Sequence, residues 1–119
     1  MIPKNSLGGK GEKEASKYLK KKGYDIVENN CRIGGSEIDI VAVKDDFLVF
    51  IEVKSRSSIE YGLPEEFVDK RKRSKIISGA RLFSVRKKYR DMFIRFDIIS
   101  VVFSGGKYNI DHLENAFEE

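Results

Sequence analysis

Two apolar runs separated by a short polar break constrain the fold of this chain more than any other feature. The runs span residues 37–43 and 47–54, and both are rich in β-branched and aromatic side chains. Such a pair predicts a β-hairpin with Asp45–Asp46 as its two-residue turn. Counting back from that turn sets Asp39 opposite Glu52, with both side chains on one face of the hairpin.

Two opposed carboxylates inside an apolar hairpin require a compensating charge. Directly opposed residues have Cβ atoms about 4.5–5.5 Å apart, and like charges at that separation are destabilising. A divalent cation between Asp39 and Glu52 is the most economical explanation. Because the chain has only one cysteine and one histidine, oxygen ligands and hence Mg²⁺ or Mn²⁺ are favoured over zinc. The backbone carbonyl of Val53 is a further candidate ligand.

Lys54 shares the face of Glu52, where its ammonium can orient an attacking water or neutralise charge developing on a phosphoryl group. Together with a cation held by Asp39 and Glu52, this lysine meets the requirements of phosphodiester hydrolysis. The same register sets Glu37 opposite Lys54, so a cross-strand salt bridge is the alternative interpretation of Glu37.

The remaining elements follow from periodicity and from glycine and proline positions. We predict helices over residues 10–22 and 64–87, strands over 24–28, 93–103 and 108–112, a loop over 29–36 and an irregular segment over 54–63. The order is α-β-β-β-α-β-β, an α/β sandwich with a central mixed sheet. With 119 residues, the chain is expected to form a single domain over residues 1–119.

Positive charge is concentrated in the second predicted helix. The net charge of the chain is +4, and five of six residues over 70–75 are basic. Such a block is typical of a polyanion-binding surface, although a solvated helix face is the alternative. The candidate nucleic-acid contacts are Arg32, Arg56, Lys70, Arg71, Lys72, Arg73, Lys75 and Arg81. Arg32 and Arg56 lie beside the predicted acidic cluster, so neutralising its carboxylates is an equal alternative for them.

Several isolated polar residues are interpreted as structural. These are Cys31, Asp97 and His112. No apolar run reaches the roughly 18 residues of a membrane span, and the N-terminus lacks the apolar core of a signal peptide. We therefore expect a cytoplasmic protein with no membrane partner.

These motifs together resemble the restriction-endonuclease-like, or PD-(D/E)XK, nucleases. They are most similar to the YraN-like family of uncharacterised proteins, which is itself similar to archaeal Holliday-junction resolvases. The residues that carry the resemblance are Gly11-Glu12, Gly23-Tyr24, Glu37 to Ala42, Val49 to Lys54, Tyr61 to Pro64, Arg95 to Ile99 and Asn115 to Phe117. Ser36 and Arg73 depart from it, since the family usually has glycine and often glutamine there.

The resemblance implies a restriction-endonuclease-like fold with Asp39 and Glu52 as metal ligands and Lys54 as the water-positioning base. It also implies that Glu12 reaches the metal site from the first helix, although an ordinary helix-start acid is the alternative. The expected activity is metal-dependent endonuclease cleavage, with DNA favoured over RNA and branched or flapped DNA as substrate. Because resolvases act as dimers, a homodimer is expected. The alternative is a non-catalytic nucleic-acid-binding module; the basic second helix disfavours a purely structural protein.

Overall fold

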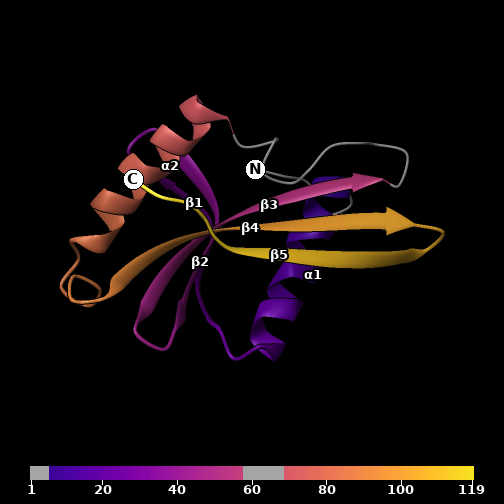
Figure 1. Cartoon of the computed structure of the whole chain (residues 1–119), viewed down its shortest axis with the longest axis horizontal. Helices are drawn as coiled ribbons and strands as arrows, with labels where there is room; N and C mark the ends of the chain where they lie inside the picture. The colour runs from indigo at the N-terminus through magenta and orange to yellow at the C-terminus, as the bar shows by residue number, and fades with distance from the viewer. Residues whose placement is uncertain (1–5, 58–68) are drawn as a thin grey trace.

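The computed structural model describes residues 6–57 and 69–119, whose helices and strands occur in the predicted order (Figure 1). The elements in this part are α1 (Leu7–Lys21), β1 (Asp25–Ile33), β2 (Ser36–Lys44), β3 (Phe47–Ser57), α2 (Lys70–Ser84), β4 (Phe93–Ser104) and β5 (Lys107–Phe117). This α-β-β-β-α-β-β order confirms the predicted α/β fold class. Neither helix of the described part is long and apolar enough to cross a membrane.

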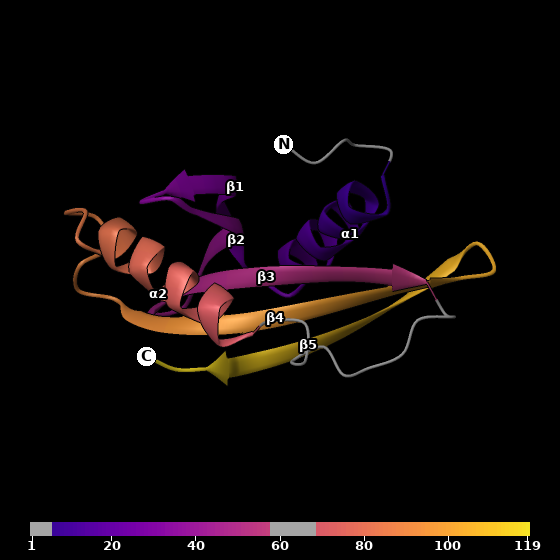
Figure 2. The same cartoon turned by 90° about the horizontal axis from the view of Figure 1, so that it is seen from above.

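The described strands form one mixed sheet in the order β1-β2-β3-β4-β5. Neighbouring strands are antiparallel except β3 and β4, which run parallel. A parallel pair requires a crossover connection, and α2 belongs to that crossover. Figure 2 shows β3, β4 and β5 side by side, with the β4–β5 turn extending past both helices.

The two helices cover opposite faces of the sheet. Phe50 of β3 packs in a core cluster with Phe83 of α2, whereas the next residue, Ile51, packs in a second cluster with Leu19 of α1. Successive strand residues point to opposite faces, so the alternation divides the core into two layers. In Figure 1, α1 crosses behind β4 and β5.

The β2–β3 hairpin has the predicted turn and register. Lys44 pairs with Phe47 across Asp45–Asp46, and the pairing continues residue by residue to Ile40 and Ile51. Asp45 takes a left-handed conformation with φ 53°, as such tight turns require.

The second helix is not continuous over the predicted residues 64–87. Asp69 has an extended backbone and its carboxylate accepts a hydrogen bond from the Lys72 N–H at 2.9 Å, so it caps a helix that begins at Lys70. The helix ends at Ser84, before the predicted residue 87. Pro64, the predicted start, lies outside the described residues.

Both edge strands are longer than predicted. The loop expected over residues 29–36 is instead the end of β1 followed by a turn at Gly34–Gly35, whose φ angles are 58° and 75°. Strand β5 continues past His112 to Phe117. Because edge strands expose much of their surface, their polar residues conceal the apolar alternation used to predict them.

Helix α1 begins at Leu7, before the predicted start at residue 10, because the Ser6 side chain accepts a hydrogen bond from the Gly9 N–H at 3.0 Å. Its next turn lies very close to β3. A Cβ atom at Gly11 would lie 1.6 Å from Oγ of Ser55, so only glycine allows this approach.

Replacing Gly11 with alanine should therefore destabilise the protein. Overpacking costs about 1–3 kcal/mol, which exceeds the gain of about 1 kcal/mol in helix propensity. We expect the free energy of unfolding, measured with urea, to fall by about 1 kcal/mol. Adding Ser55→Gly makes room for the methyl group and should restore part of the loss. A Gly11→Ala protein as stable as the wild type would contradict this close packing.

Candidate active site

Asp39 and Glu52 lie on adjacent strands, one residue beyond Ile40 and Ile51, the last pair in register. Both carboxylates are buried, with exposed fractions of 8% and 4%. Oδ2 of Asp39 accepts a hydrogen bond from the Val53 N–H at 2.8 Å. The Asp39 side chain thus connects β2 to β3 where the registered pairing ends, which keeps the two acids together.

Two ammonium groups contact Glu52. Nζ of Lys72, from α2, forms an ion pair with Oε1 of Glu52, and Nζ of Lys54 lies 3.6 Å from the same oxygen. The second oxygen, Oε2, is buried and has no hydrogen-bond partner among residues 6–57 and 69–119. Since buried polar atoms are normally paired, this oxygen is suited to a ligand.

Glu12 joins this cluster from α1. Both of its carboxylate oxygens are buried without a hydrogen-bond partner in the described part of the chain. Burial, reinforced by the charges of Glu37 and Glu52, raises the pKa of Glu12 to about 7. Its charge also acts on Glu52 and Asp39, and that Glu12 reaches a metal site stays a prediction from the resemblance.

The acids of the cluster are poorly neutralised by the lysines beside them. Burial and the charge of Glu52 raise the pKa of Asp39 to about 8, although the Val53 N–H and Lys72 oppose the shift. Burial and the proximity of Lys72 lower the pKa of Lys54. Three acids and two ammonium groups therefore form a partly buried cluster that favours taking up a proton or a further cation.

The excess of acidic over ammonium groups in this cluster predicts that the metal-free protein loses stability as pH rises. Asp39 and Glu12 have folded-state pKa values of about 8 and 7, above their unfolded values, so the folded state holds protons that the unfolded state releases. Their contribution to the free energy of unfolding is present in full below the unfolded-state pKa values. It is lost as pH rises through the folded-state pKa values. The melting temperature in EDTA should fall between about pH 5 and 8.5. Asp39→Asn should make that fall shallower; a flat wild-type profile would contradict the raised pKa values.

The acid pair suits a hard divalent cation. No group of three or more His, Cys, Asp or Glu side chains that could hold a metal occurs within residues 6–57 and 69–119. Mg²⁺, however, commonly uses only one or two carboxylates and keeps several waters. Asp39 and Glu52 meet that requirement, because their donors are oxygens and Oε2 of Glu52 lacks a partner. The carbonyl of Val53 stays a predicted ligand.

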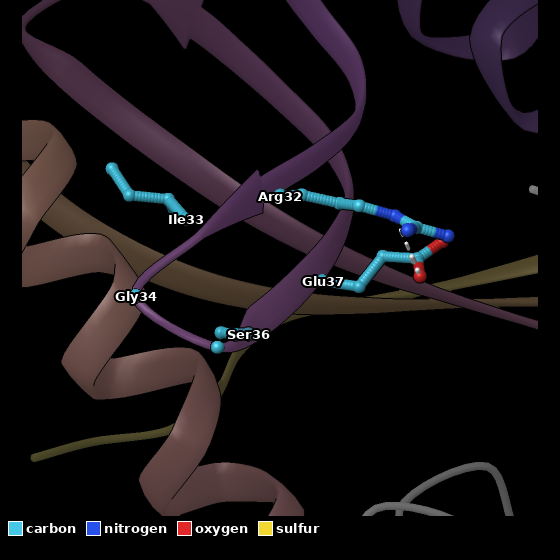
Figure 3. A pocket seen from close by; sticks show the side chains of 6 residues that line it. Arg32, Ile33, Gly34, Ser36 and Glu37 are labelled. Atoms are coloured by element: carbon cyan, nitrogen blue, oxygen red, sulfur yellow. Dashed lines mark ion pairs between the residues drawn. The ribbon is translucent and has the colours of Figure 1, made fainter.

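The predicted pairing of Glu37 with Lys54 is wrong. Glu37 instead lies opposite Arg32 of β1, with Oε2 of Glu37 3.6 Å from Nε of Arg32. Figure 3 shows the two side chains pointing toward one another beside a cavity of about 500 Å³ at the β1–β2 turn. The hairpin register ends before Glu37, and the edge strand supplies a nearer cation. Arg32 thus pairs with Glu37, and both of its predicted roles, phosphate contact and neutralisation of the acidic cluster, stay predictions.

A groove of about 380 Å³ lies between the β1–β2 turn and the first turns of α2. Its lining includes three of the predicted nucleic-acid contacts, Arg71, Lys72 and Lys75. Lys72 also contacts Glu52, so the groove adjoins the acid cluster directly.

The other predicted contacts are more scattered. Nη2 of Arg81 lies 3.1 Å from Oε2 of Glu119, and the Arg73 guanidinium lies over the Phe117 ring at 5.6 Å. Lys70 is exposed at the start of α2. Arg56 is half-buried on β3, on the same face as Lys54. The structure therefore gathers only part of the predicted basic set around the acids.

The sequence did not reveal a second buried polar cluster, centred on Asp97 of β4. This fully buried carboxylate accepts two hydrogen bonds from Arg95 at 2.9 Å, one from the Asn115 N–H at 2.9 Å, and lies 2.7 Å from Nε2 of His112. The other ring nitrogen of His112 lies 3.0 Å from the Tyr18 hydroxyl. An acid in the middle of an apolar strand was the available signal, but only Arg95 lies on the same strand, and the other two partners, His112 and Asn115, lie on β5.

Comparison with known proteins identifies the family. The model of the uncharacterised protein family UPF0102 matches residues 11–101. A UPF0102 protein of Clostridium perfringens is 44% identical over 114 residues, covering 94% of this chain and 93% of the relative. One of Caldanaerobacter subterraneus subsp. tengcongensis is 41% identical over 121 residues, covering 98% of both chains. One of Geobacter metallireducens is 44% identical over 113 residues, covering 95% and 93%. The chain belongs to the uncharacterised family UPF0102, the YraN family indicated by its motifs.

Proposed function

We propose that this protein is a metal-dependent nuclease that hydrolyses phosphodiester bonds. The observation that carries the proposal is the buried pair Asp39 and Glu52, with one oxygen of Glu52 unpartnered in the described part and Lys54 beside the other. A module that only binds nucleic acid has no use for buried carboxylates near phosphates. A hydrolase does, because they can hold a cation at the scissile bond.

Each residue of the cluster has a separate role in the proposed hydrolysis. Asp39 and Glu52 would hold Mg²⁺ or Mn²⁺, and the Val53 N–H orients the Asp39 carboxylate toward β3. The ion would supply charge neutralisation and activate a water molecule. Lys54 donates a hydrogen bond to the attacking water or to a phosphoryl oxygen, where charge develops in the transition state. Glu12, buried beside them, holds a proton or a further water.

The groove beside the acids suits a nucleic-acid backbone. Arg71 and Lys75 are exposed along it, and Lys72 connects it to Glu52. Phosphate contacts of this kind supply most of the sequence-independent affinity of proteins for DNA. The preference for branched or flapped DNA over RNA, and a homodimeric state, rest on the resemblance to resolvases.

The test is a cleavage assay on a panel of branched, flapped and linear DNA and RNA with Mn²⁺. The wild type should cut at least one substrate, whereas Asp39→Asn should not, because the amide preserves the size of the side chain but not its charge. The exposed strand residue Asp111 provides the matched control, since Asp111→Asn should cut normally. If the wild type binds tightly and cuts nothing, the protein is the alternative, a non-catalytic nucleic-acid-binding module.

A further inference from the structure

The ammonium group of Lys72 lies on the carboxylate proposed to hold the cation, at the oxygen next to the unpartnered Oε2. It forms an ion pair with Oε1 of Glu52, and its side chain is 39% exposed whereas that of Glu52 is 4% exposed. Lys72 therefore enters the cluster from the solvent side, along the groove that its own helix lines. Lys54, by contrast, reaches the same oxygen from the strand that carries Glu52.

We propose that Lys72 is an internal counter-cation that couples metal binding to nucleic-acid binding. In the metal-free protein its ammonium forms an ion pair with the Glu52 carboxylate. A divalent cation displaces it, and the released ammonium then binds a backbone phosphate in the groove. This inference rests on the proposed function and adds to it an order of events.

Electrostatics favours the displacement. One oxygen of Glu52 already attracts both Lys72 and Lys54, whose ammonium groups repel each other. A divalent cation on the same carboxylate repels them more strongly than they repel each other. Lysine has a flexible four-carbon stem, so Lys72 can leave Glu52 without movement of α2. The groove that it lines already presents Arg71 and Lys75.

The consequence is reciprocal coupling between the two ligands. Metal binding frees a positive charge for the phosphate, and phosphate binding holds Lys72 away from the metal position. By linkage, each ligand must then strengthen the binding of the other by the same factor, typically about 5- to 150-fold.

Metal affinity alone tests the first half of the proposal. Calorimetric titration with Mn²⁺, without nucleic acid, should give a Kd at least about fivefold lower for Lys72→Met than for the wild type, because the competing ammonium is gone. Lys75→Met is the matched control: the same change on the same helix, at an exposed residue. Its Mn²⁺ affinity should equal that of the wild type. Equal affinities for Lys72→Met and the wild type would overturn the inference but not the nuclease; no Mn²⁺ binding by either would overturn the proposed metal site itself.

Nucleic-acid affinity tests the second half. Fluorescence anisotropy with labelled branched DNA, checked on gels for intact strands, should give equal affinities for Lys72→Met and the wild type in EDTA, because Lys72 is then engaged by Glu52. With Mn²⁺ the wild type should gain about fivefold or more over this variant. Lys75→Met should weaken binding equally in both conditions. If Lys72→Met behaves like Lys75→Met, Lys72 is an ordinary phosphate contact and the proposed coupling is wrong.

Discussion

Replacing Lys54 with alanine should slow Mn²⁺-dependent cleavage by about 10²–10³-fold, the usual loss when one preorganised donor to a developing charge is removed. Both carboxylates stay in place, so Mn²⁺ should still bind. DNA affinity should change little, because one charge among many phosphate contacts is a small share of binding. Single-turnover cleavage and anisotropy on the same preparation separate the two effects.

Lys107→Ala is a suitable control, since Lys107 is an exposed lysine at the β4–β5 turn. The risk to folding is small, because Glu37 pairs with Arg32 rather than with Lys54. If Lys54→Ala cuts as fast as the wild type, Lys54 is not the catalytic lysine. Equal slowing by Lys107→Ala would mean that the loss reflects net charge and not the position of Lys54.

The hairpin at the centre of the candidate site was predictable because a two-residue turn leaves little freedom of register. Once Asp45–Asp46 is the turn, strand alternation decides which residues share a face. The structure confirms this register as far as Ile40 and Ile51. Asp39 and Glu52 share their face with Val41, Leu48 and Phe50, whose burial accounts for the burial of the two acids.

What could not be predicted depends on contacts between distant elements. The strands continue past their last registered pair, so counting residues from the turn predicted that Glu37 pairs with Lys54. In the structure, Glu37 pairs with Arg32 of the neighbouring strand β1. A basic run on a helix predicts a charged face but not which lysine turns toward a buried acid. The contact of Lys72 with Glu52 depends on how α2 packs on β3.

The cluster around Asp97 illustrates the same limit. Asp97 and His112 were interpreted as structural from their neighbours in sequence, and the structure joins them at 2.7 Å. The partners that complete the cluster come from α1, β4 and β5, including Tyr18 and Asn115. Burial raises the pKa of Asp97, but hydrogen bonds with His112, Arg95 and the Asn115 N–H together hold it below its usual value. This carboxylate therefore contributes stability that is present above its unfolded pKa and lost as pH falls through the folded one.

Removing that carboxylate should have the largest effect on stability of any single change proposed for this protein. Asp97→Ala leaves the Arg95 guanidinium, the His112 ring and the Asn115 N–H without their common acceptor. Breaking a buried ion pair from one side typically costs about 3–5 kcal/mol. We expect a loss of that size in urea unfolding at pH 7 and a fall in melting temperature of about 10 °C or more.

Asp111→Ala, which changes an exposed aspartate on β5, should alter neither the free energy of unfolding nor the melting temperature appreciably. Asp97→Asn should lie between them, because the amide still accepts a hydrogen bond but carries no charge. A loss below about 1 kcal/mol for Asp97→Ala would mean that the network does not hold β4 and β5 to α1.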